Sequence, residues 1–207
     1  MCGRYLFLPD RQIEEIKNIL QRINQKFQGS SFLSKLKTGE IFPTDLAAVV
    51  VAGDTEKDAT IARWGFPIEG KKQVIINARA ETLLEKWTFK KIANQRCLIP
   101  AAGFYEWQKK GDGKQKLLIK PRETPVFYMA GLYDRIKLED GGEIDAFVII
   151  TTEANSQIKP VHSRMPAILK KEHEDIWLFE KGNEKYLKKL FCTVLKPFDN
   201  EMEIESV

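Results

Sequence analysis

The sequence RCLIPAAGFYEWQKKGDGKQKLLIK, residues 96–120, decides the expected fold class. Arg96 to Pro100 and Phe104 to Gln108 are short runs rich in apolar and aromatic residues, which is typical of strands. The glycines of GDG at 111–113 then predict a hairpin turn, after which Leu117 to Lys120 would return along the preceding strand. An antiparallel hairpin is therefore expected near the middle of the chain.

Strand patterns continue on both sides of this hairpin. Val126 to Leu138 and Ile144 to Thr151 predict a second hairpin, whose turn contains EDGGE at 139–143. Closer to the N-terminus, three further short runs have the same strand character. They are Ala47 to Ala52, Thr60 to Trp64 and Gln73 to Ile76.

Helical periodicity is limited to a few segments. The clearest is Asp10 to Phe27, where large apolar side chains recur on one face and Asp10 supplies the cap. Shorter helices are expected near Asn155, at Glu172 to Phe179 and at Glu184 to Phe191, and a helical stretch broken near Trp87-Thr88 is expected from Ala80 to about Asn94. Strands interleaved irregularly with few helices predict an α+β fold. We expect a single domain over residues 1–207, with a largely antiparallel, barrel-like mixed sheet flanked by a few helices.

Length and cysteine content limit the possible functions. A chain of 207 residues can bury roughly 70% of its unfolded surface, so neither disulfides nor a metal are needed for folding. Cys2, Cys97 and Cys192 have no CxxC or Cys/His ligand spacing, which indicates a reducing compartment and argues against structural zinc. We expect no signal peptide, and the sequence has no run of roughly 20 apolar residues. We therefore expect a cytoplasmic protein with no cofactor, no metal and no membrane partner.

Net charge is a weak guide to the partner. The chain has 33 basic and 29 acidic residues, and the resulting +4 is too small to indicate nucleic acid by itself. Residues 170–207 are expected to form a helical segment and an acidic tail, EMEIESV. The rest of the protein is then more basic than the total suggests.

Cys2 is the residue with the most distinctive chemistry, because it directly follows Met1. Removal of Met1 would leave a free amine and a thiol two carbons apart. Such a 1,2-aminothiol can condense with an aldehyde through nitrogen and then close through sulfur to a five-membered thiazolidine. Position alone favours an ordinary residue near a frayed chain end, so the neighbouring motifs must decide.

Four short polar clusters lie at the ends of expected strands. Two of them contain candidate acid or base groups. Glu106 lies between Tyr105 and Trp107, a setting that would desolvate a carboxylate and raise its pKa, although a strand glutamate can equally face water. His162 lies in a loop, where a solvated surface histidine is the ordinary alternative. The four clusters are CGR at 2–4, NARAE at 77–81, GFYEW at 103–107 and HSRMP at 162–166.

Taken together, these segments resemble the SRAP family, the SOS response-associated peptidases or abasic site processing proteins of the DNA damage response. The motifs occur in the order typical of the family and end at Leu169, so residues 170–207 carry little of the resemblance. The motifs are MCGRY at the start, Pro43-Thr44, RWGF at 63–66, NARAET at 77–82, RCLIPAAGFYEW at 96–107, TTEAN at 151–155 and VHSRMPAIL at 161–169.

The resemblance implies that the protein binds single-stranded DNA and captures the ring-opened aldehyde of an abasic site as a thiazolidine on the mature Cys2. Asn77 would hold the amine and the bound sugar, and Glu106 would transfer protons during imine formation and ring closure. His162 would act on the opened deoxyribose as acid or base, supporting a lyase-like β-elimination or reversal of the cross-link. We expect a monomer in the cytoplasm, associated with the nucleoid during repair.

The expected DNA contacts are also carried over by motif. Arg4, Arg79 and Arg164 each lie inside a reactive motif, where a guanidinium can fork onto phosphate oxygens. The alternative for each is a surface ion pair worth about 0 to 1 kcal/mol. Trp64 is the candidate platform for stacking a base, with a core tryptophan as the alternative. The resemblance also implies that Thr151 lies beside these residues in the pocket that family members share.

One segment departs from the family, and two other functions stay open. After Trp64 the chain reads FPIEGKKQ, shorter than the proline- and tryptophan-bearing segment of many members, so a second aromatic wedge is missing there. One alternative is a cysteine peptidase acting on its own N-terminus through Cys2, His162 and Asn77. The other is a non-covalent binder of single-stranded DNA in which Cys2 is incidental.

Overall fold

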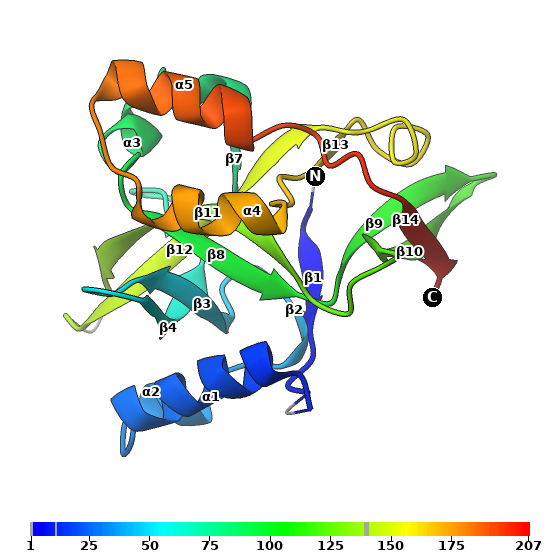
Figure 1. Cartoon of the computed structure of the whole chain (residues 1–207). Helices are drawn as coiled ribbons and strands as arrows, with labels where there is room; N and C mark the ends of the chain where they lie inside the picture. The colour runs from blue at the N-terminus through cyan, green and yellow to red at the C-terminus, as the bar shows by residue number, and fades with distance from the viewer. Residues whose placement is uncertain (1, 11, 139–140) are drawn as a thin grey trace.

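A closed ring of strands forms the centre of the molecule. The computed structural model describes residues 2–10, 12–138 and 141–207 (Figure 1). Within them, five strands pair in the order β11-β8-β3-β4-β12, and β12 pairs back onto β11. All neighbours are antiparallel except β12 and β4. The ring consists of β3 (Leu46–Ala52), β4 (Lys57–Trp64), β8 (Arg96–Ala101), β11 (Phe127–Lys137) and β12 (Glu143–Glu153).

The C-terminal half of β12 carries two further strands. Strand β7 (Asn77–Arg79) pairs with it in parallel, and β13 (Arg164–Pro166) pairs with it antiparallel. Thr151 is the shared neighbour, opposite both Arg79 and Pro166. The segments containing NARAET and HSRMP are thereby brought to the same end of one strand.

A second sheet lies beside the ring and contains the N-terminus. Its order is β14-β10-β9-β1-β2, and all its pairs are antiparallel. Figure 1 shows β1 between the ring and the long β9–β10 hairpin. The strands are β1 (Arg4–Phe7), β2 (Gly39–Ile41), β9 (Gly103–Lys110), β10 (Gly113–Pro121) and β14 (Met202–Ser206); β5 (Phe66–Pro67) and β6 (Val74–Ile75) form a separate pair.

Helices cover two opposite sides of the ring (Figure 1). Helix α1 packs against β3 and β4 through its buried isoleucines and leucine, whereas α4 packs against β8 and β3. Among the described residues no helix is both long and apolar enough to cross a membrane. The helices are α1 (Glu14–Lys26), α2 (Ser31–Ser34), α3 (Trp87–Lys90), α4 (Lys171–Phe179) and α5 (Glu184–Val194), with a 3-10 turn at Ala80–Thr82.

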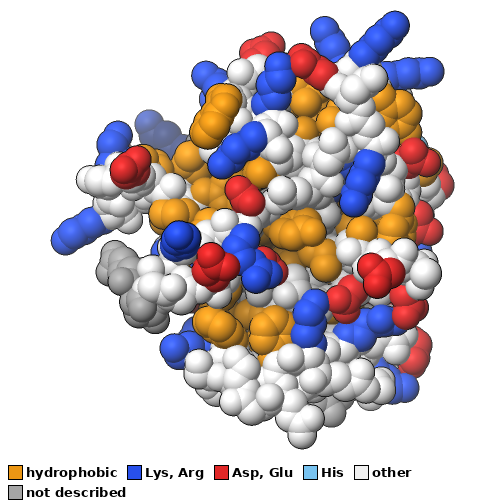
Figure 2. Space-filling model, turned by 90° about the vertical axis from the view of Figure 1, so that its left-hand side faces the viewer, with side chains coloured by type: hydrophobic (Ala, Val, Ile, Leu, Met, Phe, Trp, Pro, Cys, Tyr) orange, Lys and Arg blue, Asp and Glu red, His pale blue; other side chains and the backbone are white. Residues whose placement is uncertain are grey.

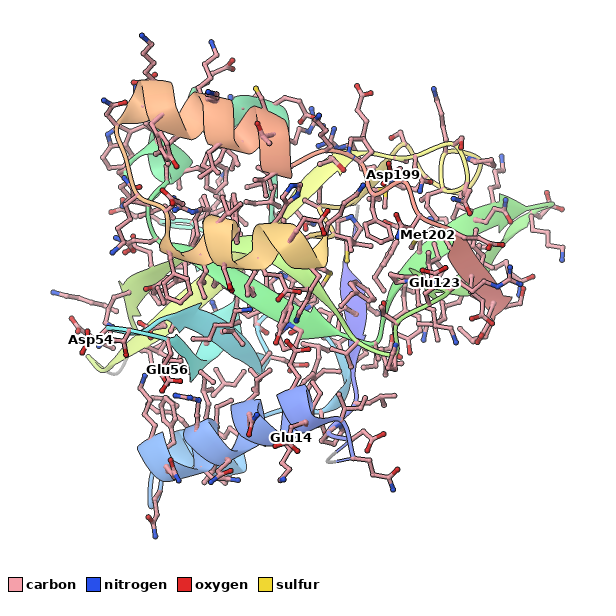
Figure 3. All side chains as sticks on the ribbon, in the orientation of Figure 1. Glu14, Asp54, Glu56, Glu123, Asp199 and Met202 are labelled. Atoms are coloured by element: carbon pink, nitrogen blue, oxygen red, sulfur yellow. The ribbon has the colours of Figure 1, made fainter. Side chains whose placement is uncertain are left out.

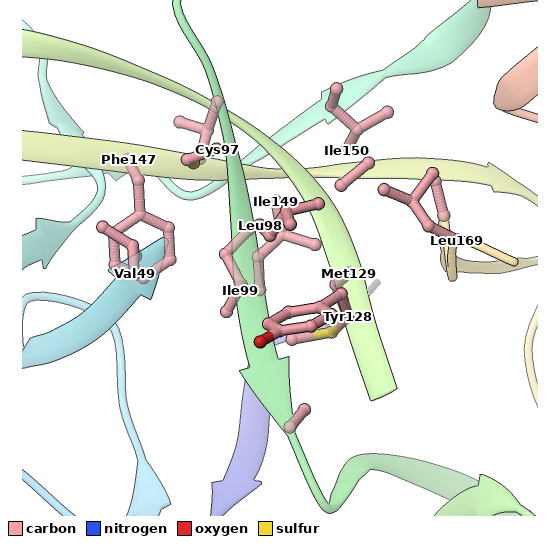
Figure 4. Packing of buried hydrophobic residues seen from close by; sticks show 14 of the residues in the cluster. Val49, Cys97, Leu98, Ile99, Tyr128, Met129, Phe147, Ile149, Ile150 and Leu169 are labelled. Carbon is pink, nitrogen blue, oxygen red and sulfur yellow. The ribbon is translucent and has the colours of Figure 1, made fainter. Parts of the chain in front are cut away.

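The core packs against both faces of the ring, because neighbouring residues such as Leu98 and Ile99 of β8 point to opposite sides of the strand. Leu98, Ile99, Met129 and Phe147 are fully buried, and Figure 4 shows side chains of β3, β8, β11 and β12 gathered in one cluster. At the tip of the β3–β4 turn, by contrast, side chains are exposed, and Figure 3 shows the charged side chain of Asp54 projecting outward. The predicted α+β fold with a barrel-like sheet is confirmed. That the chain is a single domain stays a prediction.

Some expected elements are different in the structure. The helix expected over Ala80 to Asn94 is reduced to the 3-10 turn and α3, and the segment near Asn155 forms turns rather than a helix. The acidic tail is strand β14, whose Glu203 and Glu205 pair with Lys120 of β10 at 3.4 and 2.9 Å. The predicted turn residues 139–140 lie outside the described residues.

Candidate functional site

Cys2 is anchored at the start of β1. Its side chain is fully buried, and its Sγ donates to the carbonyl of Arg4 at 3.6 Å. Strand β1 pairs on one side with β2 and on the other with β9, so backbone hydrogen bonds hold it from both edges. Cys2 is therefore part of the core rather than a frayed chain end.

Asn77 reaches Cys2 from the other sheet. It is the first residue of β7, and its Nδ2 donates to the carbonyl of Cys2 at 2.9 Å. Its Oδ1 is also buried and has no hydrogen-bond partner among the described residues. A buried acceptor without a partner costs about 1 to 3 kcal/mol, so this oxygen would gain from a ligand that donates a hydrogen bond.

Glu106 lies close enough to Cys2 to affect its titration. Its carboxylate is buried in β9, on the opposite face of the strand from Tyr105 and Trp107, so the alternative of a water-facing glutamate is excluded. Burial first and the negative charge of Glu106 second raise the pKa of the Cys2 thiol. The thiol is therefore protonated at neutral pH.

His162 lies in the loop between β12 and β13. Its Nδ1 accepts a hydrogen bond from the backbone N–H of Arg164 at 2.9 Å. The same Nδ1 lies 3.2 Å from the carbonyl oxygen of Arg164, so which ring nitrogen carries the proton depends on the tautomer. The loop ends in β13, which pairs with the same end of β12 as the strand that begins with Asn77.

The three candidate arginines have different surroundings. Arg164 donates two hydrogen bonds to Glu81, with Nη–Oε distances of 2.8 and 3.0 Å. It therefore forms an ion pair, which the sequence analysis gave as the alternative to phosphate contact. Arg4 pairs with Glu40 at 3.1 Å. Arg79 is exposed, and in the described part of the chain it has no carboxylate within 4.0 Å. Arg79 is thus the arginine of the three that is available to a phosphate without breaking an ion pair.

Trp64 is a core residue, and its prediction as a stacking platform is wrong. Its side chain is 0% exposed, and its Nε1 donates to the carbonyl of Ile76 at 3.0 Å. Tyr5 contacts the ring edge-on at a centroid distance of 5.3 Å, and Phe147 stacks on it at 6.3 Å. No face of the indole is open to a base.

Thr151 is also too deep for the direct DNA contact that was predicted. Its side chain is 0% exposed and its hydroxyl donates to the carbonyl of Ala78 at 3.5 Å. The guanidinium of Arg164 donates to both its carbonyl and its hydroxyl oxygen. Thr151 therefore holds Arg164 and β7 in place.

The sequence analysis missed a group of residues around Arg4. The guanidinium carbon lies 4.6 Å from the ring centroid of Phe42 and 4.8 Å from that of Trp107. Glu40 also accepts from Lys116 at 2.8 Å. Trp107 could have been singled out from the sequence, because it lies inside the GFYEW motif. Glu40 and Phe42 come close to Arg4 only because β1 pairs with β2, and no local sequence pattern predicts that pairing.

Charge elsewhere on the surface is mixed. Figure 2 shows basic and acidic side chains interspersed over most of one face of the molecule, with hydrophobic side chains between them. No group of three or more metal-binding side chains occurs within the described residues. The geometry around Cys2 suits proton transfer and covalent chemistry: a thiol, a buried carboxylate and an amide in contact with the Cys2 backbone.

Similarity to known proteins extends along the whole chain. The family model described as SOS response associated peptidase (SRAP) matches residues 1–207. The abasic site processing protein YoqW of Bacillus subtilis is 35% identical over 218 residues, which cover 100% of this chain and 92% of YoqW. The abasic site processing protein HMCES of Gallus gallus is 35% identical over 114 residues, 45% of this chain and 34% of HMCES.

Solved structures have the same fold. A protein from Bacteroides thetaiotaomicron superposes with a TM-score of 0.76 at 26% identity, covering 100% of this chain and 92% of that protein. A protein from Bordetella bronchiseptica has a TM-score of 0.76 at 22% identity, with 100% and 99% covered, and supports the fold alone. Because the family model spans every residue and YoqW matches over the full length, the chain belongs to the SOS response-associated peptidase family.

Proposed function

We propose that this protein processes abasic sites in single-stranded DNA by forming a thiazolidine between Cys2 and the ring-opened aldehyde of the site. The observation that carries the proposal is the burial of Cys2 between Asn77 and the carboxylate of Glu106. The names of the relatives, abasic site processing proteins, support the same substrate. The reaction requires removal of Met1, a residue outside the described ones.

The first step joins the amine of Cys2 to the aldehyde carbon. An α-amine has a pKa of about 7.7 to 8.0, so roughly a tenth of it is neutral at pH 7. Addition gives a carbinolamine, and loss of water gives an imine. Asn77 fixes the carbonyl of Cys2 and with it the direction of the amine. The carboxylate of Glu106 takes the proton from the carbinolamine nitrogen and passes it to the hydroxyl that leaves as water, so it is a carboxylate again when the imine has formed.

The second step closes the ring. The thiol adds to the imine carbon, its proton passes to Glu106, and Glu106 returns a proton to the ring nitrogen. The overall reaction therefore consumes one aldehyde and one aminothiol and releases one water, with no oxidant or reductant. Closure is intramolecular, with an effective molarity that can reach roughly 10⁵ M, and this compensates for a thiol that burial keeps protonated.

DNA contact and a later lyase-like step involve the neighbouring loop residues. Arg79 follows Asn77 by two positions and would contact a phosphate beside the lesion. His162 would act as acid or base on the opened deoxyribose, in β-elimination or in reversal of the cross-link. The self-processing peptidase is less well supported, because a peptidase nucleophile is a thiolate and the Cys2 thiol has a raised pKa.

The test is a cross-linking assay with protein whose N-terminus has been checked by intact mass. A single-stranded oligonucleotide with one abasic site is incubated with the protein and with the Cys2→Ala variant, then run on a denaturing gel. We expect a heat-stable band shifted by the protein, absent with Cys2→Ala and absent on undamaged DNA. If protein confirmed to begin at Cys2 gives no such band while it binds the oligonucleotide, non-covalent DNA binding replaces this proposal.

A further inference from the structure

The side chain of Arg4 is sandwiched on the outer face of the second sheet. Its guanidinium lies between the rings of Phe42 and Trp107, at 4.6 and 4.8 Å, and its edge pairs with Glu40. We name Arg4, Phe42, Trp107 and Glu40 the arginine clamp. A planar cation between two aromatic faces with a carboxylate at its edge is a favourable and directional arrangement.

The clamp joins three strands at the end of β1 where Cys2 lies (Figure 1). Arg4 belongs to β1, Trp107 to β9, and Phe42 directly follows β2. Only Gly3 separates Arg4 from Cys2, so the two Cα atoms are at most about 7 Å apart.

The same strands carry the reactive groups on their other side. Trp107 is adjacent to Glu106 on β9, and successive side chains of a strand point to opposite faces. Trp107 thus stacks on Arg4 outside the sheet while Glu106 faces inward beside Cys2. A change in the clamp would move the N-terminal end of β1 relative to β9.

Phe42 is held rigidly although it is 41% exposed. Its N–H donates to Oδ2 of Asp45 at 2.9 Å, and its carbonyl accepts from the N–H of Asp45 at 3.1 Å. Within this turn the N–H of Thr44 donates to the carbonyl of Trp64 at 2.8 Å. Trp64 is in the core, so the turn fixes Phe42 to the closed ring of strands.

We propose that Phe42 and Trp107 are positioning residues for Cys2. By stacking on Arg4 they hold residues 2–4 in place, so that the thiol stays beside Glu106 and the carbonyl stays on Asn77. Chain ends normally fray, and a reaction that closes a ring needs its groups held in the productive geometry. The inference rests on the proposed function for its effect on cross-linking, whereas its effect on Cys2 is independent of DNA.

The first test measures how accessible the Cys2 thiol is. In a Cys192→Ser background, which removes the exposed cysteine, the rate of alkylation by iodoacetamide at Cys2 is followed by peptide mass. We expect Phe42→Ala and Trp107→Leu to raise the rate about fivefold, the factor expected for loss of one cation–π contact. Phe42→Tyr should restore the original rate. Phe179→Ala, an aromatic on α4 with a similar 37% exposure, is the matched control and should change nothing.

The second test separates positioning from DNA contact. Cross-linking rate is measured at saturating abasic-site oligonucleotide, and affinity is measured with a tetrahydrofuran analogue that cannot open to an aldehyde. We expect Phe42→Ala to lower the rate about fivefold and to leave the affinity within about twofold. A parallel loss of affinity would mean that Phe42 contacts DNA and would overturn the positioning role.

The two proposals fail in different ways. If the unmodified protein forms no cross-link, the proposed function is wrong, and the alkylation rates still decide the clamp. If Phe42→Ala and Trp107→Leu alkylate at the same rate as the parent, the clamp does not position Cys2, whatever the DNA result.

Discussion

At the level of single residues, Thr44 has an unusual backbone. Its φ of 77° is the only positive value for a non-glycine residue among those described. A β-branched residue rarely adopts this left-handed conformation, because its Cβ crowds the backbone. Thr44 is held there by the turn from Phe42 to Asp45, which positions one ring of the arginine clamp.

Replacing Thr44 by glycine should stabilise the protein. Relief of the left-handed conformation is worth about 1 to 2 kcal/mol. The extra freedom of glycine in the unfolded chain offsets about 0.5 to 1 kcal/mol of this. We expect Thr44→Gly to raise the free energy of unfolding in urea by about 0.5 to 1 kcal/mol. Thr44→Ala, which keeps the Cβ, is the control and should gain less; a less stable glycine variant would contradict the idea of strain.

Glu106 should control the titration of Cys2. Its negative charge adds to burial in raising the pKa of the thiol, so Glu106→Gln should lower that pKa and shift the pH profile of Cys2 alkylation to lower pH. The same variant should slow cross-linking about 10²- to 10⁴-fold, because the proton-transfer group is lost. The profile is measured in the Cys192→Ser background. An unchanged profile would show that Glu106 lies too far from the thiol to act on it.

At the level of elements, Arg96 connects β8 to the helices above it. The side chain is buried, and its donors reach the carbonyls of Trp177 and Ala93. The guanidinium carbon also lies 5.4 Å from the centroid of the Trp177 ring. Burial lowers the pKa of Arg96 to about 10, and the negative charge of Glu180 offsets only part of this effect.

Removing this side chain should loosen the attachment of α4. Arg96→Met leaves two buried carbonyls without their donor, and each such group costs about 1 to 3 kcal/mol. We expect a loss of about 2 to 4 kcal/mol in the free energy of unfolding, measured by urea denaturation. A second measurement, hydrogen exchange of α4 amides, should show faster exchange than in α1. A methionine variant as stable as the parent would mean that burying the charge cancels its hydrogen bonds.

Elements differ in how far they could be predicted. The β9–β10 and β11–β12 hairpins were predicted because both strands and the turn lie within one short stretch of sequence. The pairing of β14 with β10 joins residues more than 80 positions apart in sequence, and the tail was expected to be merely acidic. The helix expected over Ala80 to Asn94 is mostly turns, because packing of Leu83, Phe89 and Ile92 into the core overrides the local preference.

At the level of the whole molecule, the candidate site is formed between two sheets. The second sheet supplies Cys2 and Glu106, whereas the strands added to the ring supply Asn77 and the loop of His162. The site therefore exists only when both sheets are assembled. Conditions that unfold the protein should abolish cross-linking over the same range in which they abolish structure.

Alkaline pH should destabilise the whole fold through its buried thiols. Burial raises the pKa of both Cys2 and Cys97, so the folded state keeps protons that the unfolded state releases above its thiol pKa of about 8.5. Stability from these groups is complete below that pH and is lost as pH rises. Between about pH 8.5 and 9.5 we expect a fall of about 1 kcal/mol for each thiol in the free energy of unfolding. Cys97→Ala should halve the fall, and an equal fall in that variant would assign it to other groups.

The sequence by itself determined the family, the α+β class and the two central hairpins, because motif order and turn residues are local signals. It also identified Cys2, Asn77, Glu106 and His162 as candidate site residues, because each lies inside one of the motifs. Tertiary structure alone decided which of these side chains meet. It buried Trp64 and Thr151, paired Arg164 with Glu81, and placed Phe42 and Trp107 on either side of Arg4. Burial and contact depend on which distant strands pair, and strand pairing is a property of the whole chain that no short segment encodes.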